Sequence, residues 1–180
     1  MIATERLNLR AWRADDAATF ATTMNSPAVM AHLGGPVALA DYEAARDRQQ
    51  ALQATHGHCL WIIERRADGA AIGFCGLKIA EVGPIAGDVE IGWRLREDAW
   101  GSGFAREAAM ASLGWAWANL DAPRVIAMTV PANQRSWGLM ARIGMVRRLD
   151  LDFGHPQFSA DHPLHQHIVY AIDRPLGRAG

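Results

Sequence analysis

Two glycines lie in a run of small residues, WGSGFAREA (100–108), between a strand-like segment and an alanine-rich helix. A strand that turns through glycines into a helix presents backbone N–H groups with no intrahelical partner, next to the positive end of the helix dipole. Gly101 and Gly103 can adopt positive φ, while Ser102 and Ala105 add little bulk. This pattern is typical of a main-chain site for an anion such as a pyrophosphate.

The turn does not fit the two common nucleotide-binding loops. A triphosphate loop ends in Gly-Lys-Ser/Thr, and no lysine follows Gly103. A dinucleotide fingerprint needs a third small residue where Arg106 stands, and it usually opens the first βαβ unit of a fold. A tight strand-to-helix connection that binds nothing is the structural alternative.

The segment before the turn, DVEIGWRL (88–95), alternates apolar and polar residues. The apolar set is Val89, Ile91, Trp93 and Leu95, and the polar set is Asp88, Glu90, Gly92 and Arg94. Successive side chains of a strand point to opposite faces, so we expect one core face and one acidic, open face.

The remaining elements must position this strand and turn. Periodicity predicts strands at 5–12, 59–66, 71–82, 124–130, 145–153 and 164–172, and helices at 15–24, 38–54, 104–120 and 133–144. Asp68 and Gly69 predict a hairpin between two of the strands. Asn133 is placed to cap the last helix and Gly144 to end it. The helix at 38–54 has a weak apolar stripe, which predicts a surface position.

This order of elements indicates the fold class. Hairpins come first and helix-linked strands follow, so we expect an α+β fold (α/β sandwich) with a mixed, largely antiparallel sheet of about seven strands and helices on both faces. With 180 residues, 50% of them hydrophobic, the chain suits one domain over residues 1–180.

Composition excludes several classes of function. The formal net charge is −1, from charges of both signs spread along the chain, so we expect no nucleic acid or membrane partner. No signal peptide or apolar span is present, which predicts a soluble cytoplasmic protein. Cys59 and Cys75 have no metal-site spacing and are expected to be reduced, buried thiols.

The chain resembles the GNAT acetyltransferase superfamily. The acyl-CoA loop of that family reads Gln/Arg, any two, Gly, any, Gly/Ala, and the corresponding residues here are Trp100, Gly101, Ser102, Gly103, Phe104 and Ala105. Trp100 replaces the Gln/Arg, but WG followed by G, an aromatic and A is similar to the RimJ/RimL-like branch of ribosomal-protein N-terminal acetyltransferases. Further matches, in order from about residue 4 to 172, are TERLNLR, IGFCGL, VEIGW, NQRSWGLMARIGM and HIVYAI.

The resemblance implies acetyl-CoA as cosubstrate, without a metal. It would bind in an opening between the fourth predicted strand (88–95) and the fifth (124–130). The pyrophosphate would lie on the backbone of the loop, and the pantetheine would pair with the strand near Trp93 and Leu95. The implied cofactor-binding residues are Trp93, Leu95, Trp100, Gly101, Ser102, Gly103, Phe104, Ala105, Asn133 and Ser136.

Acetyl transfer to an amine requires a neutral amine, a stabilised oxyanion and a proton for the departing thiolate. A backbone N–H near Trp93 is implied for the oxyanion. Glu90 is our candidate base, acting through water, with Asp88 as the second choice and a solvated strand glutamate as the alternative. Many family members carry a tyrosine where Met140 stands, so Ser136 takes the proton-donor role, the alternative being a helix-capping serine.

Four histidines, His155, His162, His165 and His167, stand close together near the C-terminus. No carboxylate or cysteine is spaced to complete a closed metal site with them, so we expect no metal there. A histidine of this loop (155–167) could contact the substrate, and its role stays open.

A protein N-terminal α-amine is the leading acceptor. At pH 7 an α-amine is neutral in about one molecule in seven, and a lysine-like amine in about one in 2,500, so a distant carboxylate suits the former. The alternatives are a small-molecule amine (polyamine, amino acid or antibiotic) and a non-catalytic acyl-CoA-binding protein. The acceptor pocket is expected between residues 25–56 and 153–165. A homodimer stays open.

Overall fold

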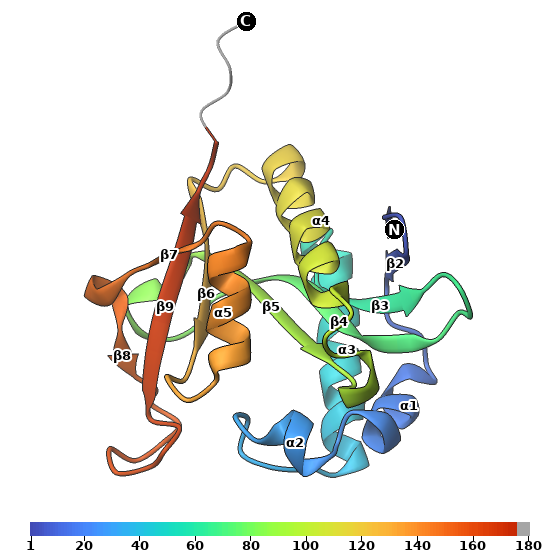
Figure 1. Ribbon diagram of the computed structural model, residues 1–180, viewed down its shortest axis with the longest axis horizontal. Coiled ribbons are helices and arrows are strands. Elements are labelled where there is room, and N and C mark those ends of the chain that lie inside the picture. Colours follow the sequence, from blue (N-terminus) through green and yellow to red (C-terminus); the bar gives the residue numbers. More distant parts are fainter. Residues whose placement is uncertain (176–180) are drawn as a thin grey trace, which may run out of the picture. The chain divides into compact units, whose positions relative to one another are not determined.

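The computed structural model describes residues 1–175, so the last five residues of the predicted 1–180 domain lie outside the described range. The chain forms two compact units, one made of residues 1–78 and 91–112 and the other of 79–90 and 113 onward. Strand β5 (Val89–Leu95) and helix α4 (Phe104–Asn119), both labelled in Figure 1, each contribute residues to both units.

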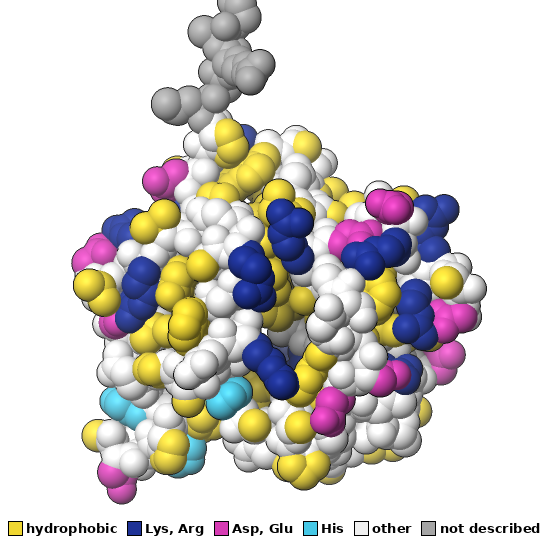
Figure 2. Space-filling view, viewed as in Figure 1, with side chains coloured by type: hydrophobic (Ala, Val, Ile, Leu, Met, Phe, Trp, Pro, Cys, Tyr) yellow, Lys and Arg dark blue, Asp and Glu magenta, His cyan; other side chains and the backbone are white. Residues whose placement is uncertain are grey.

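The first unit contains an antiparallel sheet in the order β1, β2, β3, β4 and the later part of β5. Its strands are β1 (Ile2–Ala3), β2 (Leu7–Arg10), β3 (Leu60–Arg65) and β4 (Ala71–Ile79). The predicted hairpin is confirmed, because Arg65 N–H donates to the Ala70 carbonyl at 2.8 Å and Gly69 has φ +71°. Figure 2 shows basic and acidic side chains interspersed over this hairpin.

Three helices belong to the first unit: α1 (Asp16–Thr23), α2 (Pro27–Met30) and α3 (Leu39–His56). Helix α1 packs against α3, and Trp12, Phe20 and Phe74 form an aromatic cluster with ring centroids 5.4–6.2 Å apart. Helix α3 buries only Tyr42 and Gln49, which confirms its predicted surface position. The four-residue α2 was not predicted, because it is too short to show a helical period.

The second unit contains the start of β5, β6 (Arg124–Thr129), β9 (Gln166–Asp173) and β7 (Val146–Arg147), with β8 (Phe153–Gly154) paired to β9. The pair β5/β6 is parallel, with Glu90 opposite Ile126, and the pairs to β9 are antiparallel. Helix α5 (Gln134–Arg142) follows β6. The core of this unit packs against Met128, Leu151 and Phe153. It consists of Ala80, Ile85, Ile126, Val169 and Ala171.

The predicted strand at 145–153 is wrong. That segment forms β7, a 3-10 turn at Leu149–Leu151 and β8. Arg147 forms an ion pair with Asp152, and Arg148 pairs with Asp150 at 2.7 Å. Residues five apart in an extended strand are about 17 Å apart, so the Arg147–Asp152 pair requires the chain to bend between them.

The predicted fold class is confirmed as a mixed α/β fold with a largely antiparallel open sheet. Within residues 1–175 the strands number nine rather than about seven, since β1 is added and the predicted strand at 145–153 divides into two. Cys59 and Cys75 are buried free thiols, as expected, and burial raises the pKa of each to about 12. No helix in the described range is long and apolar enough to cross a bilayer.

Candidate functional site

The glycine turn, residues Gly101–Gly103, joins the end of β5 to α4 through a short 3-10 segment (Glu97–Ala99). Gly101 has φ +76° and Gly103 has φ +81°, so both predictions of positive φ are confirmed. A side chain at either position would be strained in this conformation. All three residues of the turn are exposed, so an anion could approach its backbone.

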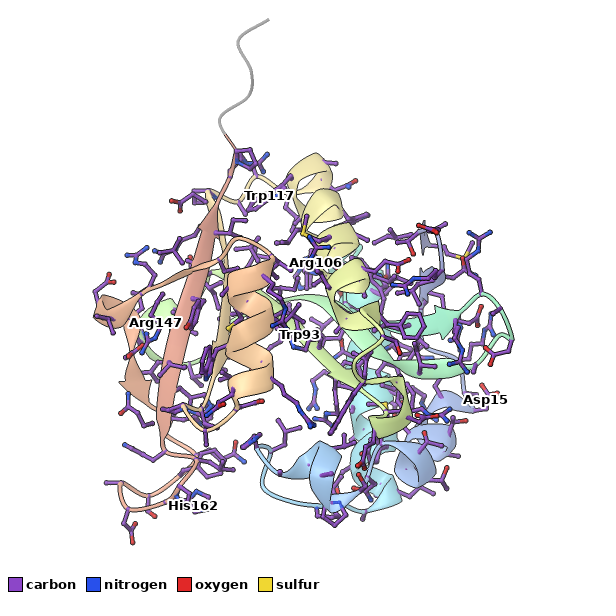
Figure 3. All side chains as sticks on the ribbon, viewed as in Figure 1. Asp15, Trp93, Arg106, Trp117, Arg147 and His162 are labelled. Carbon is purple, nitrogen blue, oxygen red and sulfur yellow. The ribbon has the colours of Figure 1, made fainter. Side chains whose placement is uncertain are left out.

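Helix α4 begins immediately after the turn. Glu107 N–H donates to the Gly103 carbonyl at 3.1 Å, so the Gly103 carbonyl accepts the first hydrogen bond of the helix. The N–H groups of residues 104–106 precede that bond and have no helical acceptor in an α-helix. Arg106, labelled in Figure 3, is exposed in the same turn and lines an open groove of about 700 Å³ with Gly103 and Met110. This arrangement favours a negatively charged ligand.

Trp100, which replaces the family's Gln/Arg, holds the turn to the strand. Its indole Nε1–H donates to the Leu95 carbonyl at 2.9 Å. The bond spans the corner between β5 and the turn, and it engages the carbonyl of one of the two residues predicted to pair with pantetheine. The departure from the family pattern therefore has a structural role here.

The sequence did not predict the contacts of Arg6 with the turn. Its guanidinium donates to the Ser102 carbonyl (3.0 Å) and to Glu107 Oε2 (2.7 Å), and it lies 4.7 Å from the ring centroid of Phe104. Thr4 Oγ1 donates to Glu107 Oε1 at 2.6 Å. We call these five residues the Arg6 clamp. TERLNLR matches the family pattern, but nothing local in it points to residues about a hundred positions away.

The clamp also sets the charge state of Glu107. Burial by itself would raise the pKa of Glu107, but hydrogen bonds from Thr4 and from the backbone and side chain of Arg6 outweigh it and hold that pKa below its usual value. The carboxylate therefore stays ionised at neutral pH. It keeps Arg6 fixed over the start of α4, on the segment where the anion would bind.

The middle of β5 is more accessible than its ends. Gly92, Trp93 and Arg94 are partly exposed, whereas Ile91 and Leu95 are buried. Trp93, labelled in Figure 3, lies on this stretch of the first unit. Because neighbouring residues of a strand point to opposite faces, the strand is accessible on both sides there.

The expectation that Glu90 lies on an open face is wrong. Glu90 is 6% exposed, because it lies on the part of β5 that pairs with β6 inside the sheet. The alternative that Glu90 is a solvated strand glutamate is wrong for the same reason. Asp88, the second choice for the base, forms a two-pronged ion pair with Arg124 at 3.2 and 2.8 Å. The carboxylate of Asp88 is engaged in that pair, and the choice of Glu90 as the base stays a prediction.

Asn133 caps α5, as predicted. Its Oδ1 accepts from Ser136 N–H at 3.3 Å, and its Nδ2 donates to Thr129 Oγ1 at 3.0 Å. Ser136 is half-buried in the first turn of α5, and its hydroxyl makes no hydrogen bond within residues 1–175. Met140 is 1% exposed and belongs to the core. Gly144 follows the helix with φ +89°, as expected.

The histidine-rich loop is held by ring packing. Phe153 stacks with His155 and His167 at 6.2 and 5.8 Å, and the two histidine rings are 4.9 Å apart. Burial lowers the pKa of His167, so this ring is neutral at pH 7. Figure 2 shows histidine side chains beside hydrophobic ones in this loop. Within residues 1–175, no group of three or more His, Cys, Asp or Glu could hold a metal ion.

The predicted site residues divide between the two units. The first unit brings together the strand residues Trp93 and Leu95 and the loop residues 100–105. The second unit contains Glu90, Asn133 and Ser136. The cofactor and catalytic roles of these residues stay predictions.

The sequence and the fold both match known acetyltransferases. The family model of the acetyltransferase (GNAT) domain matches residues 6–146. Protein YkkB of Bacillus subtilis is 30% identical over 148 residues, 80% of this chain and 84% of YkkB. The N-acetyltransferase p20 of Bacillus licheniformis is 30% identical over 141 residues, 76% of this chain and 77% of p20. An acetyltransferase structure from Agrobacterium tumefaciens superposes with a TM-score of 0.76 at 29% identity, covering 95% of this chain and 92% of the other.

Two solved structures with only 16% identity show likeness of fold alone. One is the RimL ribosomal L7/L12 α-N-protein acetyltransferase with coenzyme A, which has a TM-score of 0.75. The other is the spermidine N-acetyltransferase from Vibrio cholerae with CoA and spermine, which has a TM-score of 0.71. The same fold therefore serves a protein and a small-molecule acceptor.

Proposed function

Because the chain belongs to the acetyltransferase (GNAT) family and is an acetyl-CoA-dependent N-acetyltransferase, we propose that it acetylates a primary amine by direct transfer in a ternary complex. The leading acceptor is the α-amine of a protein N-terminus. Motif order and the WG-G-aromatic-A loop support placement in the RimJ/RimL-like branch. Localisation in the cytoplasm stays a prediction.

The glycine turn is the observation that carries the proposal. Two positive-φ glycines, an exposed backbone and the start of an α-helix fit a diphosphate, which needs several N–H donors and no side-chain bulk. The bound coenzyme supplies the acetyl thioester. The Arg6 clamp and Trp100 hold the turn in place for it.

The remaining roles are assigned to residues of this chain. Glu90 accepts the proton of the amine, through water. A backbone N–H near Trp93 donates to the carbonyl oxygen, where negative charge develops. Ser136 donates the proton that the thiolate requires, and Asn133, which caps the same helix, contacts the pantetheine.

The cofactor loop can be tested with Gly103→Trp. A tryptophan at φ +81° both strains the turn and covers the N–H groups at the start of α4, so we expect acetyl-CoA affinity in calorimetry to fall by about a hundredfold or more. Gly87→Trp is the matched control, because Gly87 has φ +92° and open space around it but lies outside the turn. Equal affinity in the wild type and Gly103→Trp would show that the turn does not bind the diphosphate.

The acceptor can be tested by measuring thiol release from acetyl-CoA with N-terminal peptides, polyamines, amino acids and aminoglycosides. We expect the highest kcat/KM for a peptide α-amine. Faster turnover of a small amine would identify a small-molecule acetyltransferase. Tight coenzyme binding without turnover of any acceptor would favour a binding protein and contradict the proposal.

A further inference from the structure

Several buried or half-buried arginines of this chain have a carboxylate or a backbone carbonyl as partner for their charge. Arg10 is 8% exposed and pairs with Asp16 at 2.8 Å, and Arg124 pairs with Asp88 at the same distance. Arg174 donates to the carbonyls of Trp117, Leu120 and Ala122. Such partners offset the cost of removing a guanidinium from water.

In contrast to these arginines, Arg94 has no carboxylate and no backbone carbonyl as a hydrogen-bond partner among residues 1–175. Its Nη1 lies 3.4 Å from Met30 Sδ, and its guanidinium lies 5.2 Å from the ring centroid of Phe74. It is also within hydrogen-bonding reach of the Tyr42 hydroxyl. Glu97, three residues along the chain, accepts from Ser26 instead. The side chains next to Arg94 come from α2, α3 and β4 of the same unit, and these three elements are labelled in Figure 1.

These neighbours do not neutralise Arg94. Burial raises the pKa of Tyr42, and the nearby charge of Arg94 only partly opposes this increase. The Tyr42 hydroxyl therefore stays protonated. The Tyr42 hydroxyl donates its proton to the Met24 carbonyl at 3.1 Å. A thioether and an aromatic face are weak partners for a cation that burial destabilises. The half-buried site around Arg94 therefore carries an uncompensated positive charge.

We propose that Arg94 binds a carboxylate of the acceptor, so that the preferred substrate is an amine that also carries a carboxyl group. The planar guanidinium has five N–H donors in a fork that matches a carboxylate, and the contacts above use few of them. Arg94 is partly exposed, so a ligand can reach it from solvent. This inference rests on the proposed function, since it concerns the acceptor of that same reaction.

The position of Arg94 in the strand supports an acceptor role. It follows Trp93, whose backbone we assign to the reacting carbonyl, on the accessible middle of β5. Its neighbours Met30 and Tyr42 lie in the segment 25–56, which is predicted to border the acceptor pocket. A carboxylate held here would place the amine of a short molecule or of a peptide N-terminus beside the strand.

Matched pairs of acceptors test the proposal. One pair is alanine and alaninamide, which differ in the α-carboxyl group. The other is Ser-Asp-Ala amide and Ser-Asn-Ala amide, which differ in a side-chain carboxylate near the α-amine. The two pairs distinguish a free amino acid from an acidic peptide as the source of the carboxylate. For each acceptor the ratio of variant to wild-type KM is compared, so differences in amine pKa cancel.

Arg94→Gln should raise KM for the acid member of the preferred pair about tenfold or more, because it loses a charge-assisted hydrogen bond. KM for the amide or Asn member should stay within about twofold, with kcat and acetyl-CoA affinity near wild type. Arg94→Lys keeps the charge and should give an intermediate KM, which provides a second variant if Arg94→Gln unfolds. Arg13→Gln, which removes an exposed arginine of the same unit, should change no KM.

Two results would overturn the inference while the proposed function stands. In one, Arg94→Gln leaves the KM of both acid members within about twofold of the wild-type value. In the other, Arg94→Gln and Arg94→Lys change both members of each pair by the same factor, which would show a structural arginine. If the wild type binds acetyl-CoA but acetylates none of the four acceptors or the wider panel, the proposed function fails and the inference fails with it.

Discussion

Glu90 is a carboxyl-bearing residue in the buried part of a central strand, 6% exposed and opposite Ile126 of β6. A carboxyl group is rarely placed in such a position unless it is paired or has a chemical task. Its neighbour Asp88 has an arginine partner and a more accessible side chain. At the scale of single residues, the pair with Arg124 engages the carboxylate of the second candidate, and we keep Glu90 as the proposed base.

Replacing Glu90 with Gln tests that role. The amide has almost the same shape but cannot accept the proton, so we expect kcat to fall by roughly 10²–10⁴ while acetyl-CoA affinity stays within about twofold. Steady-state kinetics with a peptide acceptor and calorimetry with acetyl-CoA measure the two quantities. Asp88→Asn is the comparison, and we expect it to affect stability more than turnover. Full turnover by Glu90→Gln would remove it from the mechanism.

At the scale of elements, the connection from β5 to α4 is held by side chains as well as by its glycines. The Arg6 clamp attaches the turn and the first residues of α4 to the N-terminal segment, and Trp100 attaches the turn to β5. These contacts fix the backbone N–H groups before a ligand arrives. Preorganisation of this kind lowers the cost of ordering a loop on binding.

Arg6→Ala should therefore weaken acetyl-CoA binding by about tenfold, with kcat at saturating acetyl-CoA near that of the wild type. Arg6→Lys keeps the charge beside Glu107 but loses the fork and the ring contact, so partial recovery is expected. Calorimetry and the split between KM and kcat measure the effect. An equal loss of kcat in Arg6→Ala would instead indicate general damage to the fold.

The link between β7 and β8 predicts a dependence of stability on pH. The hydrogen bonds of Arg147 hold the pKa of Asp152 below its usual value of 3.8, and Asp152 also accepts from Val169 N–H at 3.0 Å. Because the folded pKa is depressed, the stabilisation is complete above the unfolded pKa. It disappears as the pH falls through the folded pKa.

Asp152→Asn should lower the free energy of unfolding by about 2 kcal/mol at pH 7, and the difference from wild type should shrink as the pH falls below about 4. Urea unfolding between pH 7 and pH 3 measures it. Asp150→Asn is the matched control, because Asp150 is 62% exposed and its pair with Arg148 contributes little. A difference at pH 3 as large as the difference at pH 7 would contradict the assigned cause.

At the scale of the whole molecule, β5 and α4 each run without interruption through both compact units. An element cannot easily lose its structure in one half while keeping it in the other, because helix formation is cooperative and strands depend on their neighbours. We therefore propose that the chain is a single cooperative domain, as its length and composition predicted.

Ile126→Ala tests this proposal. Ile126 is fully buried in the core of the second unit, so the cavity should cost about 2–5 kcal/mol and lower the midpoint of one thermal transition by roughly 5–15 °C. Differential scanning calorimetry measures the midpoint and the agreement between calorimetric and van't Hoff enthalpies. Val146→Ala, at a residue 66% exposed, is the control. Two transitions, of which only one shifts, would mean that the units unfold separately.

The sequence by itself determined the features that depend on short stretches of chain. Positive φ at Gly101 and Gly103, the Asn133 cap and the Asp68–Gly69 hairpin follow from preferences that act over two to four residues. Hydrophobic periodicity determined the fold class for the same reason. It failed at 145–153, because the two short strands there each have only two residues and carry no readable period.

Only the tertiary structure decided which residues meet. Arg6 and Glu107 are 101 positions apart, and no local preference links them. The burial of Glu90 depends on its pairing with β6, and the uncompensated charge of Arg94 depends on the side chains that α2, α3 and β4 place around it. Burial and electrostatic partners are properties of the space around a side chain, and that space is created when distant segments pack together.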